Sequence, residues 1–187
     1  MTSEDHKELG DRLDTLGIRL AMRHKLTGNL EDIEAAISSA NRAVSITPKD
    51  HQSHLSNVLN NLSCHLSNRH KRTGNMDDLE AAISNIQAAL SITPEDDSSL
   101  PSRLANLGSD LYSRYERLGN AKDIETAISK TQHAISATPQ DDTDLSQRLN
   151  NLGNMLHYQY KRTGDRQVTI AYPKLRHRGL ASADTFL

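Results

Sequence analysis

The stretch R-T-G-N at residues 72–75 decides the fold, because close copies of it recur through the chain at an almost constant interval. The other copies are L-T-G-N at 26–29, R-L-G-N at 117–120 and R-T-G-D at 162–165. The glycines of successive copies are 46, 45 and 45 residues apart. A second marker keeps the same interval and consists of S-I-T-P or S-A-T-P, ending at Pro48, Pro94 and Pro139. Repeats of this length predict an array of helical units that bury their apolar faces against each other.

Two helical patterns alternate within each period. The first pattern, which we name the A helix, precedes the glycine and repeats leucines at three- and four-residue steps, as on one face of an α-helix. These leucines are Leu13, Leu16 and Leu20, then Leu59, Leu62 and Leu66, then Leu104, Leu107 and Leu111, then Leu149, Leu152 and Leu156. The second pattern, the B helix, follows the glycine at residues 30–46, 76–92 and 121–137 with a stripe of alanine and branched apolar residues. The sequence therefore predicts four A helices and three B helices.

The junctions between these helices carry the matching turn chemistry. Glycine suits the left-handed backbone position just past a helix end, and the asparagine after it can cap the next helix in three copies, as Asn29, Asn75 and Asn120. Lysine and arginine gather before each glycine, where positive charge complements the carboxyl end of a helix. One such segment, N-R-H-K-R at 68–72, could also be taken for a nucleic-acid patch, but its recurrence at each helix end favours the capping role. The Asp-rich linkers that follow each proline are predicted to cap the next A helix.

The composition excludes several classes of protein. Only 35% of the residues are hydrophobic and 3% aromatic, which indicates a thin, elongated core. The formal net charge of −2 provides no general attraction to nucleic acid or to an anionic membrane. The single cysteine, Cys64, cannot form an intramolecular disulfide and fits a reducing compartment. No apolar run approaches the roughly 18 residues of a membrane-spanning helix, and the acidic, polar start is unlike a signal or transit peptide. We expect a cytoplasmic protein.

The repeats resemble those of the tetratricopeptide-repeat (TPR) family over about residues 6–165. The A helix matches the family pattern of a large residue, then Leu-Gly, then another large residue, as in Leu149, Leu152–Gly153 and Leu156. The B helix carries the small residues of the pattern, such as Ala36 and Ala43, and ends at a proline. The period is longer than the usual repeat of about 34 residues. This long form is similar to repeat arrays of fungal proteins that carry a caspase-like CHAT peptidase domain and, more distantly, to kinesin light chain repeats.

The resemblance implies an all-α fold, an α-solenoid of antiparallel helix pairs in a TPR-like superhelix. Residues 1–165 form an array of about 3.5 repeats. Residues 166–187 depart from the pattern, with a proline at 173 and three basic residues within K-L-R-H-R, and are predicted to be an irregular or disordered tail. A basic binding tail is the alternative. The fourth A helix consequently has no B helix of its own, which suggests a homo-oligomer through this uncapped C-terminal helix.

No group of residues has the pattern of a catalytic or metal site. Pairs of histidines fall within about a turn of each other, but without a third ligand at matching spacing they are weak metal ligands; the pairs are His51 with His54 and His65 with His70. His24 and His70 occupy a slot that tyrosine fills in later copies, which favours a packing role at the helix end. Cys64 beside His65 suggests a cysteine hydrolase, but adjacent helical residues point about 100° apart, and a nucleophile must touch its base. We therefore expect no enzyme activity and no cofactor.

The A helices of such a superhelix line its concave side, and a column of asparagines on them is the candidate site. In TPR proteins with a similar A helix, these asparagines bind the backbone of an extended peptide. By this resemblance we assign peptide binding to Asn61, Asn106 and Asn151, with the flanking residues Asn60, Asn150, Asn154, Tyr112 and Tyr158. The column is broken by Thr15 in the first copy. The alternative is that the amides bridge neighbouring repeats or face water.

The sequence therefore predicts a module that binds a protein or peptide ligand. Because the charge of the asparagine face is mild, we expect an internal extended segment as the ligand and not an acidic C-terminal tail. Two alternatives stay open: an oligomerisation or sensor arm of a larger CHAT-type signalling protein whose effector domain is absent from this sequence, and a cysteine hydrolase using Cys64.

Overall fold

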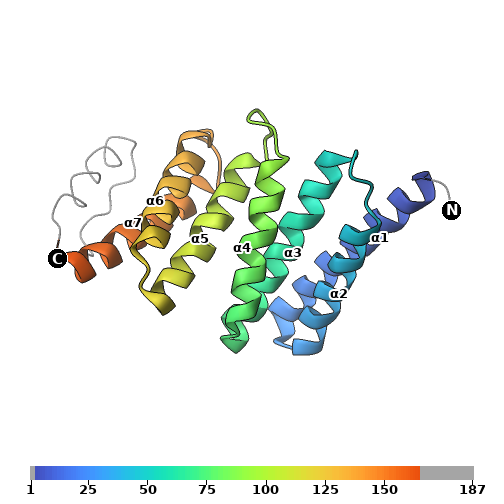
Figure 1. Ribbon diagram of the computed structural model, residues 1–187, viewed down its shortest axis with the longest axis horizontal. Coiled ribbons are helices and arrows are strands. Elements are labelled where there is room, and N and C mark those ends of the chain that lie inside the picture. Colours follow the sequence, from blue (N-terminus) through green and yellow to red (C-terminus); the bar gives the residue numbers. More distant parts are fainter. Residues whose placement is uncertain (1–2, 165–187) are drawn as a thin grey trace.

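The computed structural model describes residues 3–164, which form seven α-helices and no strand (Figure 1). The helices are α1 (Ser3–Thr27), α2 (Leu30–Ile46), α3 (Gln52–Thr73), α4 (Met76–Ser91), α5 (Leu100–Leu118), α6 (Ala121–Ser136) and α7 (Leu145–Thr163). The A helices are thus α1, α3, α5 and α7, and the B helices are α2, α4 and α6, so the predicted all-α order is confirmed. The predicted tail at 166–187 lies outside the described residues.

The helices stand side by side in chain order along the long axis of the molecule (Figure 1). Each helix packs against the next one in the chain, and the A helices also contact each other, α1 with α3, α3 with α5 and α5 with α7. No two B helices of the described chain approach each other to the same extent. A row whose A layer is closer together than its B layer curves with the A helices inside. We call the side of the A helices that points away from the B helices the inner face.

Each A helix ends at a glycine in the left-handed conformation, as the repeated turn predicts. The backbone angle φ lies between 68° and 75° at Gly28, Gly74, Gly119 and Gly164. The following asparagine caps the B helix in all three complete copies, because its side-chain oxygen accepts a hydrogen bond of 3.0 Å from the backbone N–H two residues on. Both predictions from local turn chemistry are confirmed.

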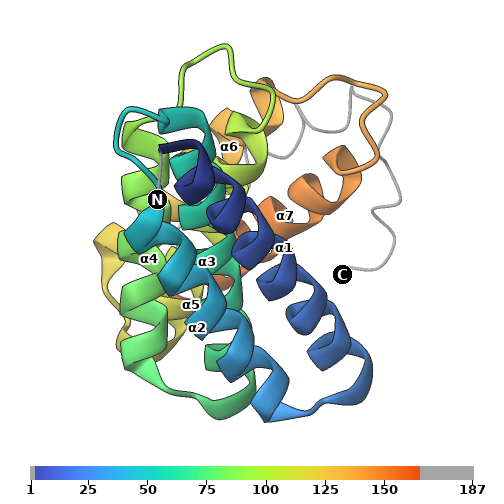
Figure 2. The ribbon, with the colours of Figure 1, turned by 90° about the vertical axis from the view of Figure 1, so that its right-hand side faces the viewer.

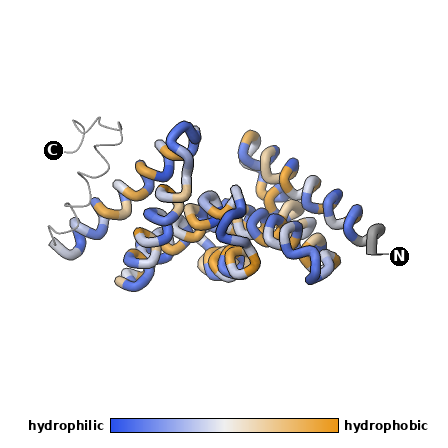
Figure 3. The backbone as a smooth tube through the Cα atoms, turned by 90° about the horizontal axis from the view of Figure 1, so that it is seen from above, coloured by the Kyte–Doolittle hydropathy of each residue, from blue (hydrophilic) through white to orange (hydrophobic). Residues whose placement is uncertain are grey.

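The core consists of small apolar clusters at the contacts between A helices and neighbouring B helices. Leu62 and Leu66 of α3 pack with Ile33 and Ile37 of the preceding α2. Leu107 and Leu111 of α5 pack likewise with residues of α4 and α6. Apolar and polar segments alternate along the helices at both ends of the array (Figure 3), which is the pattern of a helix buried on one stripe.

Gly108 lies where α5 comes close to its own B helix, α6. A methyl group added at this glycine would lie 2.4 Å from Thr131 Oγ1 and 3.1 Å from the carbonyl oxygen of Ala127. The Leu-Gly pair of the A helix therefore has a steric reason in this copy.

An ion pair joins the two helices of each pair. Near the end of the A helix an arginine donates two hydrogen bonds to a buried aspartate in the first turn of the B helix; the pairs are Arg23–Asp32, Arg69–Asp78 and Arg114–Asp123. In the third pair the distances are 2.9 Å from Nε and 2.7 Å from Nη2. The hydrogen bonds from Arg23 lower the pKa of Asp32. Besides complementing the helix end, these arginines therefore fasten the A helix to the B helix.

The predicted capping of the A helices by the Asp-rich linkers is wrong, because the N-cap residues of α3, α5 and α7, which are His51, Ser99 and Asp144, make no side-chain capping hydrogen bond. Asp97 accepts a hydrogen bond from the backbone N–H of Ser99, and Asp142 accepts one from Asp144, but neither residue is the N-cap of the next helix. Two of the three linkers are instead held by a buried arginine of the following A helix. Arg103 donates to Thr93 Oγ1 at 3.0 Å and lies 3.6 Å from Asp97.

Arg148 repeats this arrangement in the next linker with Thr138, Asp142 and Asp144. The α2–α3 linker has no such arginine, because Val58 occupies the position. This linker is also shorter, since α3 begins earlier in its repeat and leaves only residues 47–51 between the helices.

Removal of one ion pair should lower the stability of the array. Asp123→Asn leaves Arg114 with a weaker partner in a mostly buried position, so we expect the free energy of unfolding to fall by roughly 2 kcal/mol. Urea denaturation followed by circular dichroism measures the change. Glu125→Gln, an exposed carboxylate on the same helix, is the matched control. Equal midpoints for the two variants would contradict a structural role for the pair.

Candidate functional site

The predicted asparagine column lies on the inner face, where Asn61, Asn106 and Asn151 are half-buried on α3, α5 and α7. Asn61 donates from Nδ2 to both carboxylate oxygens of Asp14 on α1, at 3.0 and 3.1 Å. Asn106 donates from Nδ2 to Asn60 Oδ1 on α3 at 3.1 Å and to Cys64 Sγ at 3.4 Å. Each amide thus reaches back to the preceding A helix. At these two positions the amides therefore bridge neighbouring repeats, which is one of the alternatives to peptide binding that the sequence left open.

The third asparagine has a different partner. The acceptor position used by Asp14 and Asn60 is occupied by Ala105 in the third copy, so Asn151 has no amide or carboxylate to reach there. Its Oδ1 instead accepts a hydrogen bond of 2.9 Å from Gln147 of its own helix. Two flanking candidates on the same helix, Asn150 and Asn154, are exposed.

The two tyrosines predicted to flank the column lie together at the α5–α7 junction. The rings of Tyr112 and Tyr158 meet edge to face with centroids 5.8 Å apart, and Tyr158 contacts the buried Tyr115 in the same way at 5.7 Å. The guanidinium of Arg162 lies over Tyr115, 5.2 Å from the ring centroid. Burial, together with a hydrogen bond to Glu116, raises the pKa of the Tyr112 phenol. The structure therefore brings these tyrosines together in a packed aromatic cluster that stays partly exposed.

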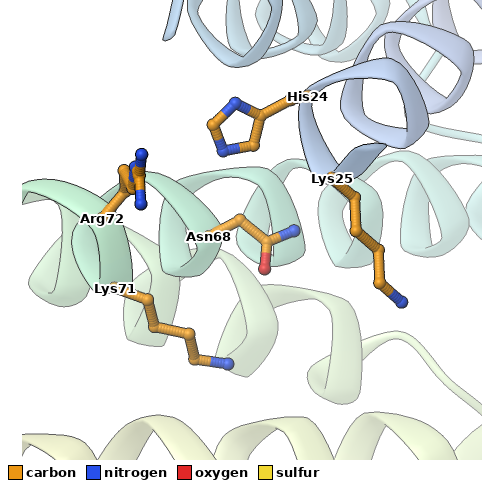
Figure 4. Close-up of a pocket in the computed structure, with 5 residues that line it drawn as sticks. All are labelled: His24, Lys25, Asn68, Lys71 and Arg72. Atoms are coloured by element: carbon orange, nitrogen blue, oxygen red, sulfur yellow. The ribbon is translucent and has the colours of Figure 1, made fainter. Parts of the chain in front are cut away.

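A basic pocket that the sequence analysis missed lies at the glycine-turn edge of the same face. It has a volume of about 320 Å³ and is lined by residues near the ends of α1 and α3, namely His24, Lys25, Asn68, Lys71 and Arg72 (Figure 4). His24 is held in place because its Nδ1 lies 2.7 Å from the carbonyl oxygen of Asn29. The sequence does show basic residues at the end of each A helix. That recurrence is already explained by the favourable interaction of positive charge with the carboxyl end of a helix, so it did not indicate a pocket.

The opposite edge of the array, formed by the linkers, has the opposite charge. A second pocket, of about 460 Å³, lies between the α4–α5 and α6–α7 linkers, and its charged lining consists of Glu95, Asp96, Asp97, Asp142, Asp144 and Arg148. The near-zero net charge of the chain therefore conceals a basic pocket at one edge and a mainly acidic pocket at the other.

A buried carboxyl group lies between α3 and α5. Asp110 is covered by protein and accepts a hydrogen bond of 2.8 Å from Ser67 Oγ. Burial raises its pKa from 3.8 to about 6, although the hydrogen bond from Ser67 and the charge of Lys71 act in the opposite direction. Asp110 is thus an inter-repeat contact whose charge depends on pH.

The environment of Cys64 is unlike that of a nucleophilic cysteine. Burial raises the pKa of the thiol to about 11, and burial also lowers the pKa of the neighbouring His65 to about 4. A catalytic cysteine needs the reverse, a lowered thiol pKa and a base in contact. Over residues 3–164, no three His, Cys, Asp or Glu side chains are grouped as a metal site would need.

Among the helices of residues 3–164, none has both the length and the apolar character needed to cross a membrane.

Comparisons with known proteins show the fold. A de novo designed helical repeat protein is similar at a TM-score of 0.53 and 14% identity, over 94% of this chain and 93% of that one. Two filament structures, DHF119 and DHF79, have TM-scores of 0.49 and 0.44 at 14% and 17% identity, and the matches cover 93% and 94% of this chain and 93% and 87% of those. No protein-family model and no curated protein matches the chain. The chain has a helical repeat fold, as the first of these structures shows.

The buried carboxyl group makes the stability of the array depend on pH. Because folding raises the pKa of Asp110, the folded chain binds its proton more tightly, and this contribution to stability is lost as the pH rises through 6. Asp110→Asn should therefore gain stability relative to the wild type between pH 4 and pH 7, by up to about 3 kcal/mol. Urea denaturation at several pH values measures the difference between the two proteins.

The quantity to compare is the difference in unfolding free energy between the variant and the wild type. Burial lowers the pKa of His65, so its titration changes the stability of both proteins in the opposite direction to Asp110, and this contribution cancels in the difference. Asp141→Asn, at an exposed position, is the control. If the difference in unfolding free energy between Asp110→Asn and the wild type does not change with pH, burial does not raise the pKa of Asp110.

Proposed function

We propose that the array is a protein-interaction module that binds an extended peptide segment along its inner face. The observation that carries this proposal is the row of half-buried amides on successive A helices. A surface that binds a peptide through its backbone, without selecting side chains, needs donors and acceptors at regular intervals. The primary amide of asparagine provides both. The resemblance to the TPR family supports the same location.

All three amides keep hydrogen-bonding capacity beyond the contacts that they make inside the array. Within the described residues, Asn106 uses its nitrogen for Asn60 and Cys64 and its oxygen for no donor. The oxygen of Asn61 has one long contact, 3.5 Å from Asn60 Nδ2. Asn151 uses its oxygen and leaves its nitrogen. Asn61 and Asn106 can therefore accept from peptide N–H groups, and Asn151 can donate to a peptide carbonyl.

The basic pocket adds a preference at one edge of this face. Lys25, Lys71 and Arg72 surround a space that suits an acidic side chain of the bound segment. We therefore expect the ligand to be an extended segment with an acidic residue on the side of the glycine turns. The proposal requires no cofactor and assigns the chain no catalytic step.

Loss of the amides should abolish peptide capture. The experiment selects ligands from a displayed library of 15-residue peptides on the intact chain and measures the affinity of an enriched peptide by fluorescence anisotropy. We expect Asn106→Ala with Asn151→Ala to weaken binding at least about ten-fold, since two hydrogen bonds to peptide groups are lost at about 1 kcal/mol each. The control is Asn41→Ala, an exposed asparagine on α2.

Circular dichroism should show the same helicity for all three proteins. The peptide should also bind more weakly to Lys71→Ala if it carries an acidic residue in the basic pocket. Unchanged affinity in the double variant would remove the inner face as the binding site.

A further inference from the structure

One side of α1 is open where the matching side of every later A helix is covered. Leu16 is 47% exposed, whereas its counterparts Leu62, Leu107 and Leu152 are only 2 or 3% exposed. Those three pack with residues of the preceding B helices, α2, α4 and α6. No described helix precedes α1, and it lies in front of the others when the array is viewed from this end (Figure 2).

The arginine two turns after this leucine is also more exposed than its counterparts in the later A helices. The side chain of Arg23 is 62% exposed, against 28% for Arg69 and 22% for Arg114. At the later junctions the preceding B helix brings a glutamate to this arginine. Arg114 Nη1 lies 2.7 Å from Glu80 Oε2 of α4. The pKa of Arg69 is raised, first by its hydrogen bond to Asp78 and also by the charge of Glu34 on α2.

The open side of α1 is basic as well as apolar. Arg12, Leu16, Arg19 and Arg23 follow one another at four-, three- and four-residue steps, so they lie on one side of the helix. All four are exposed, and Arg12 also contacts Glu8 at 2.5 Å. A leucine flanked by arginines complements a helix with an apolar stripe and acidic residues beside it.

We propose that this side of α1 binds an amphipathic helix of a partner protein, with its apolar stripe on Leu16 and a glutamate on Arg23. The α2–α3 and α4–α5 junctions supply the geometry, since the segments I-E-A-A-I at 33–37 and L-E-A-A-I at 79–83 make this contact inside the array. The three described B helices of a second copy are not the occupant, because their apolar stripes are already covered by α3, α5 and α7. The binding surface is separate from the inner-face amides.

A peptide with the sequence of α4, residues 76–91, is the probe. It carries three acidic side chains and no basic one. Fluorescence anisotropy of the labelled peptide with the full chain measures binding. We expect Leu16→Glu to weaken binding about ten-fold, which corresponds to the loss of one buried leucine contact. The matched control is Leu118→Glu, since this leucine is 63% exposed on α5.

A second measurement changes only the peptide, so it is independent of how well a protein variant folds. Glu80→Lys in the peptide should weaken binding several-fold, because it places a cation opposite Arg23. The proposal is overturned if the wild type does not bind the peptide, or if Leu16→Glu and Leu118→Glu bind it equally. It is also overturned if light scattering finds a dimer that Leu16→Glu disrupts, since the surface would then belong to a second copy.

Discussion

The arginine near the end of each of the first three A helices holds the repeat together, because it connects groups that lie on different helices. In each pair it donates two hydrogen bonds to a buried aspartate of the B helix. In the third pair the same guanidinium also contacts Glu80 of the preceding pair, so one side chain fixes both the hairpin and the junction. The fourth A helix carries Gln159 at this position. The arginine is therefore missing from the one described A helix that is not followed by a described B helix.

The inner face combines two properties that work in the same direction. Asn61 and Asn106 bridge neighbouring A helices, which holds their side chains in place, and their side-chain oxygen atoms remain available to the proposed peptide. Preorganised polar groups lose less conformational entropy on binding than free ones. Ala105 interrupts the bridging set, so the capacity for a ligand is greatest toward α7, where Asn151 keeps its nitrogen and the tyrosine cluster is partly exposed.

Features governed by local rules could be predicted from the sequence. The four glycines, the three capping asparagines and the helix periodicity depend only on backbone sterics and on neighbours within a few residues, and the structure confirms them. The acceptor for Asn61 could not be predicted, because it is Asp14 of another repeat and depends on how two helices are offset. The basic pocket depends in the same way on the distance between the ends of α1 and α3.

Repeat symmetry itself led to one wrong expectation. The leucine stripe assigns Leu16 the same environment as Leu62, but no described helix precedes α1 to cover this position, and Leu16 is exposed. Likewise, the buried Arg103 and Arg148 look like surface residues in a helical pattern. Their partners lie in the linkers and in the preceding repeat, beyond the reach of local patterns.

The presence of these buried arginines at two of the three linkers makes the junctions of the array unequal. Arg103 ties the α4–α5 linker to Asn57, and Arg148 ties the α6–α7 linker to Ser102, but Val58 leaves the α2–α3 linker without such a tie. In a chain whose units contact only their neighbours, cooperativity passes through each junction in turn. The repeats are therefore coupled by different groups along the array: a guanidinium reaches the preceding A helix at the α4–α5 and α6–α7 junctions, whereas at the α2–α3 junction Asn61 and His54 of α3 contact Asp14 and Asp11 of α1.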